Sequence, residues 1–284
     1  VELVESLLSL TSPSVWNTTL FKRGLAGMLA LYFLPMIVLY LGQDEFVFQP
    51  QPLPAEHTYH FPFTFEELWL EPTGGPAINA IWARPESRPA RGVVLYFHGN
   101  RDHLERWGNE LSPFLERDYA ALAIDYRGYG KSEGDPTEEG LYQDGMLAYR
   151  WAVARGYRPE EIVLYGRSLG SGVATYIAAR ADARLLILET PYNSIEGAIE
   201  SRLAGLALPF SVAARFPNEE HLKRVDEPVR IFHGTNDQVV PYASARRLQP
   251  VLKPGDRFFS LHGADHHNVH EYRAYLRELD RMLR

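Results

Sequence analysis

The sequence predicts an α/β fold whose central sheet is mostly parallel and carries helices on both faces. Short, nearly continuous apolar runs alternate with longer helical segments from residue 92 onward. Strands that are covered on both faces need such runs, and strand–helix alternation is typical of parallel sheets. A serine between two glycines also follows one of these runs, at the point where a helical pattern begins.

Residues 24–42 are the first element, an apolar run of nineteen residues without a charge. At ~1.5 Å per helical residue, this run is roughly long enough to cross a bilayer. Lys22 and Arg23 precede it and acidic residues follow it, so the positive-inside rule predicts a cytoplasmic N-terminus and a non-cytoplasmic downstream chain. We predict a membrane-anchoring helix. A signal peptide, a buried core helix and a helix kinked at Pro35 that enters one leaflet are the alternatives.

The segments on either side of this run differ in character. Residues 1–23 place apolar side chains at helical spacing, which predicts an amphipathic segment that lies on the membrane surface or packs on the globular domain. Residues 43–56 contain three prolines, which disfavour helix, so we expect an extended linker there. The soluble domain is then expected to span residues 57–284.

The soluble domain is expected to begin with antiparallel strands and to continue with buried ones. The early strands are expected at 57–63, 66–72 and 78–85, and the buried strands at 92–99, 119–126, 161–168, 184–190, 229–234 and 257–263. Helical patterns fill the gaps at 104–117, 138–155, 169–181, 241–252 and 268–283.

One connection is longer than a simple crossover needs, because almost forty residues separate the strand that ends near residue 190 from the next one. Its apolar side chains are Leu203, Leu206, Leu208, Phe210, Val212 and Phe216. We predict that residues 191–226 form a small cap or lid over the carboxyl edge of the sheet, where open α/β sheets bind ligands.

The stretch Gly166-Arg167-Ser168-Leu169-Gly170 lies between a strand and a helix, which is the context of a nucleophile elbow. The tight turn needs small neighbours, and the following helix offers backbone N–H groups to a developing negative charge. We predict that Ser168 is the nucleophile. A serine that only caps the helix is the alternative.

An oxyanion hole needs two backbone donors, one after the nucleophile and one from the loop after an earlier strand. The Leu169 N–H is the first candidate. Asn100, in the stretch His98-Gly99-Asn100 that follows another strand, supplies the second. His98 itself is expected to brace this loop.

A serine nucleophile needs a base, and the base needs an acid that orients it. Asp237 and His266 follow the last two strands, at the same edge as Ser168, in the order serine, acid, histidine. We predict a triad of Ser168, Asp237 and His266, with His267 as the alternative base. A plain turn at Asp237 is the alternative interpretation.

Composition narrows the remaining classes of function. The chain has 284 residues, a net charge of −7, no long basic run and no cysteine, which argues against nucleic-acid binding and excludes disulfides and thiolate chemistry. Carboxylates near the clustered histidines follow no zinc-site spacing, so we expect no metal and no cofactor. No obligatory protein partner is evident. The histidines of this cluster are His262, His266, His267 and His270.

The motifs FHGN, DYRGYGKSEG, GRSLGSG, LETPYNS, HGTNDQVVP and GADHHN resemble those of the α/β-hydrolase superfamily. More narrowly, the chain resembles the membrane-anchored α/β-hydrolase-domain serine hydrolases over about residues 40–284. This resemblance implies an eight-stranded sheet and a triad carried by Ser168, Asp237 and His266. Relatives often have His-Asn-Asp where this chain has His266-His267-Asn268. The group includes esterases, acylglycerol lipases and protein depalmitoylases.

These features together predict a membrane-anchored serine hydrolase that cleaves carboxylic esters of lipid-like acyl chains, as a carboxylesterase or a monoacylglycerol lipase does. The apolar cap and the nearby bilayer favour an acyl chain in the pocket. An acyl-protein or acyl-carrier thioesterase would use the same residues. A peptidase and a non-catalytic membrane scaffold are further alternatives. Dehalogenases and epoxide hydrolases carry aspartate at the elbow, where this chain has serine.

Overall fold

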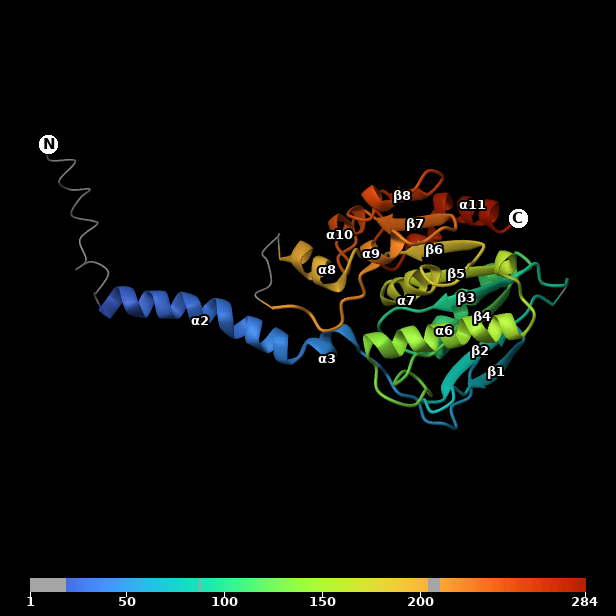
Figure 1. The fold of residues 1–284 in the computed structure, drawn as a ribbon, viewed down its shortest axis with the longest axis horizontal. Helices are drawn as coiled ribbons and strands as arrows, with labels where there is room; N and C mark the ends of the chain where they lie inside the picture. The colour runs from blue at the N-terminus through green and yellow to red at the C-terminus, as the bar shows by residue number, and fades with distance from the viewer. Residues whose placement is uncertain (1–18, 87, 204–209) are drawn as a thin grey trace.

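The computed structural model describes residues 19–86, 88–203 and 210–284, and eight of its strands form one sheet (Figure 1). The strands are β1 (Phe65–Leu70), β2 (Ile78–Ala83), β3 (Val93–Phe97), β4 (Ala120–Ile124), β5 (Ile162–Arg167), β6 (Leu185–Glu189), β7 (Val229–Gly234) and β8 (Arg257–Leu261). Their order is β1-β2-β4-β3-β5-β6-β7-β8. β2 pairs antiparallel with β1 and β4, and the other neighbours pair parallel. The mostly parallel eight-stranded sheet and its antiparallel start are confirmed.

Helices of the domain cover both faces of this sheet (Figure 1). They are α4 (Leu104–Trp107), α5 (Ser112–Leu115), α6 (Glu138–Ala154), α7 (Leu169–Ala178), α8 (Ile195–Arg202), α9 (Asn218–Leu222), α10 (Tyr242–Arg246) and α11 (Arg273–Met282). Short 3₁₀ helices join them at η2 (Gly108–Leu111), η3 (Pro159–Glu161), η4 (Gln249–Val251) and η5 (Val269–Glu271).

Two apolar cores form because successive side chains of a strand point to opposite faces of the sheet. Val93, Leu95 and Phe97 of β3 belong to a first core, which includes residues of α6, α7 and α9. Val94 and Tyr96 belong to a second core, which includes residues of α4, α5 and α11. Burial on both faces explains why the central strands read as continuous apolar runs.

The first expected strand, at 57–63, is wrong. These residues form no strand, and the rings of Tyr59, Phe61 and Phe63 stack instead, with centroids 5.9 and 5.4 Å apart. Alternating side chains indicate which face is buried, whereas a strand also needs a partner for its backbone groups.

Two expected helices are shorter than their sequence pattern. The segment 104–117 divides into α4, η2 and α5, and the segment 241–252 divides into α10 and η4. Pro113 lies in the first turn of α5 and Pro250 in the first turn of η4. Proline is tolerated at the first turn of a helix but has no N–H with which to extend the helix before it.

The helix α2 (Thr19–Leu41) extends away from the domain (Figure 1). It runs through Pro35 without ending and contains nearly all of the expected anchor, 24–42. The window Phe21–Val38 is long and apolar enough to cross a membrane, and none of it is buried. Residues 1–18 of the expected amphipathic segment, 1–23, lie outside the described residues.

The expected extended linker, 43–56, is wrong at its start. Residues Gln43–Val47 form the short helix α3, and Val47 and Phe48 are buried in the first core. The prolines of this segment begin only at Pro50, so they do not prevent a helical turn before it.

The expected cap, 191–226, contains α8 and α9, while Leu206 and Leu208 lie outside the described residues. Val212 and Phe216 are buried, and Phe216 belongs to the first core, so these two side chains stabilise the domain. The amide of Asn218 donates to the Ser171 hydroxyl at 3.0 Å, which ties α9 to α7.

Candidate active site

Ser168 lies between β5 and α7 in a strained conformation, with φ 51° and ψ −117°. Such a backbone costs a non-glycine residue about 1–3 kcal/mol and persists only where the surroundings enforce it. The flanking glycines allow the close packing of this turn. A Cβ on Gly170 would lie 2.0 Å from the carbonyl oxygen of Phe97, and a Cβ on Gly166 would lie 2.4 Å from that of Gly170. The expected strand–turn–helix context is present.

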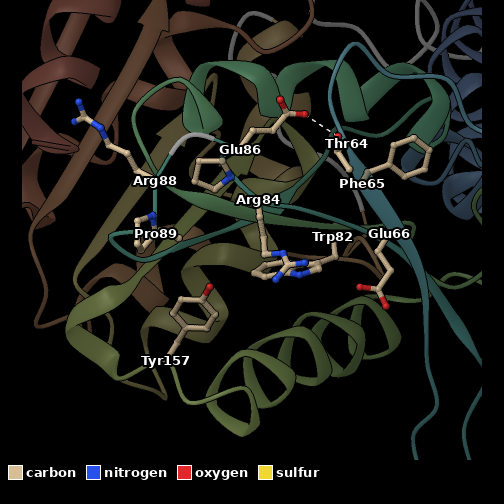
Figure 2. Close-up of a pocket in the computed structure, with 11 residues that line it drawn as sticks. Thr64, Phe65, Glu66, Trp82, Arg84, Glu86, Arg88, Pro89 and Tyr157 are labelled. Carbon is tan, nitrogen blue, oxygen red and sulfur yellow. Dashed lines mark hydrogen bonds between the residues drawn. The ribbon is translucent and has the colours of Figure 1, made fainter.

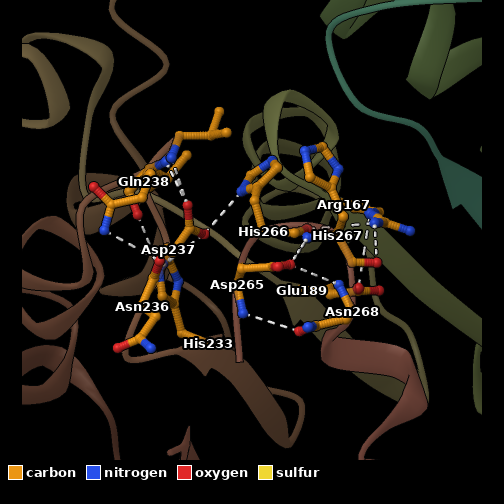
Figure 3. A network of polar contacts seen from close by, with 12 residues as sticks. Arg167, Glu189, His233, Asn236, Asp237, Gln238, Asp265, His266, His267 and Asn268 are labelled. Atoms are coloured by element: carbon orange, nitrogen blue, oxygen red, sulfur yellow. Dashed lines mark hydrogen bonds and ion pairs between the residues drawn. The ribbon is translucent and has the colours of Figure 1, made fainter. Parts of the chain in front are cut away.

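Asp237 and His266 meet at the same edge of the sheet, where Nδ1 of His266 lies 2.8 Å from Oδ2 of Asp237 (Figure 3). A carboxylate only accepts hydrogen bonds, so Nδ1 carries the proton and Nε2 is left as a proton acceptor. The other oxygen, Oδ1, accepts the backbone N–H groups of Val239 and Val240, each at 2.8 Å. The loop thus fixes the carboxylate, and the carboxylate orients the imidazole.

His233, which the sequence motifs did not predict as part of the site, is fully buried at the end of β7. Its Nε2 lies 3.3 Å from Oδ2 of Asp237 and 3.1 Å from the carbonyl oxygen of Val240. Burial lowers the pKa of His233, so the ring is neutral and its N–H serves these two acceptors. The sequence signal that could have identified His233 is a His-Gly pair at the end of a strand. The chain carries the same pair directly after β3.

The four clustered histidines have different surroundings. His266 is buried, whereas His262 and His267 are exposed, and the backbone N–H of His267 donates to Asp265. His270 instead approaches Glu189 of β6, at 3.7 Å. The structure therefore pairs His266, and not His267, with Asp237. Within the described ranges, no group of three or more histidines and carboxylates is placed to hold a metal ion.

The loop after β3 packs directly against Ser168. A Cβ on Gly99 would lie 3.6 Å from the Ser168 Cβ and 3.2 Å from the ring of Trp107. His98 is fully buried, and its Nδ1 lies 2.7 Å from the carbonyl oxygen of Gly99, as expected of a residue that braces the loop. The side chain of Asn100 accepts two hydrogen bonds through Oδ1. This loop therefore has a fixed place beside Ser168.

Arg167, which precedes Ser168, was also missed as a contributor to the site. Its side chain is 1% exposed, and Nη2 donates to the backbone carbonyls of His266 and His267, each at 3.4 Å (Figure 3). Nη1 donates to Glu110 at 3.2 Å. The guanidinium thus links the strand that precedes Ser168 to the loop that carries His266. The elbow pattern leaves this position unspecified, so no motif marked it.

Glu189 at the end of β6 balances this buried charge. Nε of Arg167 lies 3.7 Å from its Oε1. Burial alone would raise the pKa of Glu189, but the charge of Arg167 and the contacts with His270 and the Tyr165 hydroxyl outweigh burial and bring the pKa to about 2. The carboxylate is therefore charged at neutral pH, and its contact with His270 raises the pKa of that imidazole.

A surface hollow of about 590 Å³ lies at the opposite ends of the strands from Ser168 (Figure 2). It is lined by residues that begin β1, end or follow β2, or precede β3 and β5, among them Trp82, Arg84 and Tyr157. The amino ends of the parallel strands meet there, whereas Ser168, Asp237 and His266 all follow carboxyl ends. The hollow is therefore separate from the candidate active site.

Known proteins with similar sequences include hydrolases. The family model described as serine aminopeptidase, S33, matches residues 88–218. Human alpha/beta hydrolase domain-containing protein 17B is 30% identical over 205 residues, which are 68% of this chain and 67% of that protein. Lysophosphatidylserine lipase ABHD12 of Macaca fascicularis is 30% identical over 257 residues, which are 78% of this chain and 61% of that protein. The chain thus spans about three fifths of the length of that lipase.

Solved esterases share the fold. The Pyrococcus furiosus esterase Pf2001 has a TM-score of 0.65 over 83% of this chain and 97% of its own, at 14% identity. Est1E of Butyrivibrio proteoclasticus, solved with ferulic acid, has a TM-score of 0.59 over 76% of this chain and 96% of its own, at 20% identity. At these identities the likeness concerns the fold alone.

Proposed function

From its membership of the α/β-hydrolase superfamily, we propose that this chain is an ester-hydrolysing enzyme, a membrane-anchored serine hydrolase of lipid-like acyl esters. The observation that carries the proposal is the 2.8 Å contact between His266 and Asp237, at the sheet edge where Ser168 occupies its strained elbow. The lysophosphatidylserine lipase among the similar proteins supports a lipid ester as the substrate class.

In the proposed reaction, Oγ of Ser168 attacks the ester carbonyl while Nε2 of His266 takes the hydroxyl proton. Asp237 holds the imidazole through Nδ1 and stabilises the imidazolium that forms. The backbone N–H groups of Leu169 and Asn100 stabilise the oxyanion of the tetrahedral intermediate. His266 then gives its proton to the departing alcohol, which leaves an acyl-serine. Water activated by His266 releases the fatty acid and restores the hydroxyl.

The exposed apolar side chains of α2 support a membrane anchor. Leu31 and Leu34 are 79% and 63% exposed, and water does not favour such a surface on a helix. With 23 residues, the helix is about 34 Å long, which matches the hydrocarbon core of a bilayer. Lys22 and Arg23 at its N-terminal end place the catalytic domain, in this proposal, on the non-cytoplasmic side.

The test is hydrolysis by the full chain in detergent micelles. Substrates are p-nitrophenyl esters from acetyl to palmitoyl, monoacylglycerols and lysophosphatidylserine. We expect turnover of medium or long chains, and a loss of about 10⁴-fold or more in Ser168→Ala, because no other group can form the acyl-enzyme. Ser112→Ala, which changes a serine of α5, serves as the matched control and keeps its activity.

Other results would redirect the proposal. Turnover of acetyl esters alone would contradict a lipid-like substrate and indicate a small closed pocket. A preference for aminoacyl amides would favour the peptidase activity named by the matching family model. A chain that hydrolyses none of these esters, and whose Ser168 does not react with a fluorophosphonate, would be a scaffold rather than an enzyme.

A further inference from the structure

The connector between the apolar helix and the sheet, residues 47–53, lies against the loop that carries Asn100. Resting on the proposed function, we propose that this connector completes the oxyanion hole. In this proposal the Asn100 side chain is a positioning group. It is held by the Gln49 backbone and the Tyr129 hydroxyl, and it thereby fixes the Asn100 N–H that faces the developing negative charge.

Two hydrogen bonds join the connector to the loop, and a third joins Tyr129 to the loop. Oδ1 of Asn100 accepts the backbone N–H of Gln49 at 3.0 Å and the hydroxyl of Tyr129 at 2.9 Å. Nε of the next residue, Arg101, donates to the side-chain carbonyl of Gln49. Two consecutive residues of the loop are therefore tied to one residue of the connector.

The chemistry of these contacts suits a positioning role. An amide oxygen has two lone pairs, and Gln49 and Tyr129 occupy both, which holds the Asn100 side chain in one orientation. Tyr129 is fully buried, so water does not compete for its hydroxyl. On the other side of the loop, Gly99 packs between Trp107 and Ser168. The loop is thus fixed from both sides, and oxyanion stabilisation depends on donors being fixed before the reaction.

The connector is itself anchored in the domain. Val47 and Phe48 are 8% and 5% exposed and belong to the first core. The N–H of Leu53 donates to the carbonyl of Gly130 at 2.7 Å, and the N–H of Gly130 donates to the carbonyl of Gln51 at 3.1 Å. These bonds fix the connector against the turn that carries Tyr129. The catalytic unit therefore begins at Val47, ten residues before the start expected at His57.

The experiment compares full-chain variants that remove one hydroxyl or one amide. Tyr129→Phe removes a donor to Asn100 while it keeps the ring. Tyr59→Phe is the matched control, because the hydroxyl of Tyr59 is also buried and donates to an asparagine, Asn79, at the same 2.9 Å. Asn100→Ala removes the acceptor itself. Each variant is assayed for kcat, KM, Tm and the rate at which a fluorophosphonate labels Ser168.

We expect Tyr129→Phe to lower kcat about fivefold, the usual effect of one neutral hydrogen bond, with KM changed less than about twofold. Asn100→Ala lowers kcat about 10- to 100-fold, approaching the loss of an oxyanion donor. Because both substitutions break the same contact, the double variant loses less than the product of the two effects. Tyr59→Phe lowers Tm by a similar amount but leaves kcat and the labelling rate unchanged.

Equal kcat losses in Tyr129→Phe and Tyr59→Phe would overturn the proposal, because the effect would then follow stability. A kcat within twofold of wild type in Tyr129→Phe would overturn it as well, whether or not Asn100→Ala folds. These results are distinct from failure of the proposed function. In that case the wild type itself neither hydrolyses esters nor labels at Ser168, and both proposals fall.

Discussion

The loop that carries His266 and the loop that carries Asn100 are held in place by different means. The histidine loop is held by charge, since buried Arg167 donates to its backbone and is balanced by Glu189 and Glu110. The Asn100 side chain is held by neutral hydrogen bonds from Tyr129 and the connector. A buried ion pair costs a great deal to break on one side, whereas a neutral bond costs little and does not titrate. The two halves of the site should therefore respond differently to mutation and pH.

The largest effect is expected from His266, the base of the proposed triad. His266→Ala lowers kcat/KM by about 10³-fold or more, because Ser168 is then left without a proton acceptor. His267→Ala is the matched control, because the His267 side chain is next in sequence but does not contact Asp237. The activity of this variant stays within a few-fold of wild type. Steady-state kinetics on a medium-chain ester measure kcat/KM for both variants. A greater loss in His267→Ala would transfer the role of base to that residue.

The next largest effect concerns the charged anchor of the histidine loop. Arg167→Gln leaves Glu189 buried without its counter-ion, so we expect the free energy of unfolding to fall by about 3–5 kcal/mol. Urea denaturation of the detergent-solubilised chain measures it. Arg158→Gln, which removes one partner of an exposed ion pair with Glu161, leaves the transition nearly unchanged. Similar losses of unfolding free energy in both variants would contradict the prediction, because the buried ion pair would then contribute no more to stability than the exposed one.

A smaller, pH-dependent effect is expected at His270. The Glu189 carboxylate raises its pKa above the usual 6.5, with Glu110 acting in the same direction and Arg167 opposing it. A raised histidine pKa adds stability that is fully present below pH 6.5 and is lost as the pH rises through the folded-state value. The Tm gap between wild type and His270→Asn should therefore be wide at pH 6 and narrow by pH 9. A gap that stays constant from pH 6 to pH 9 would contradict this prediction.

The smallest effect concerns the hydrogen bond between Tyr129 and Asn100, whose contribution to kcat should not change with pH. Burial raises the pKa of Tyr129 above its usual value, so its hydroxyl keeps the proton throughout the physiological range. The ratio of kcat between wild type and Tyr129→Phe should stay constant from pH 6 to pH 9. A ratio that changes across this range would show that a titrating group also holds the Asn100 loop.

Much of the sheet was predictable because the central strands are buried on both faces. Continuous apolar runs such as 92–99 and 184–190 report that burial directly, and the structure places β3 and β6 within them. The failure at 57–63 has the opposite cause. Its aromatic alternation is real, but the side chains of Tyr59 and Phe61 stack on each other while the backbone has no strand partner.

The candidate site was predictable as far as local patterns reach. Ser168 lies in a five-residue motif, and Asp237 and His266 follow strands in a recognisable order. Arg167 and Tyr129 were not predictable in their roles, because their partners are distant in sequence. Arg167 contacts residues about a hundred positions away, and Asn100 meets Gln49 across 51 positions. Such pairings depend on the folded topology, which no single segment encodes.

The early start of the domain has a consequence for how a substrate is found. The stretch from Leu41, at the end of α2, to the buried Val47 can span at most about 21 Å. With α2 in a bilayer, as we propose, the enzyme is held at nearly constant height above the lipid. Search then occurs by lateral diffusion in two dimensions, and turnover follows the number of substrate molecules per unit of membrane area. Diluting the vesicles at fixed lipid composition should leave the rate per enzyme unchanged.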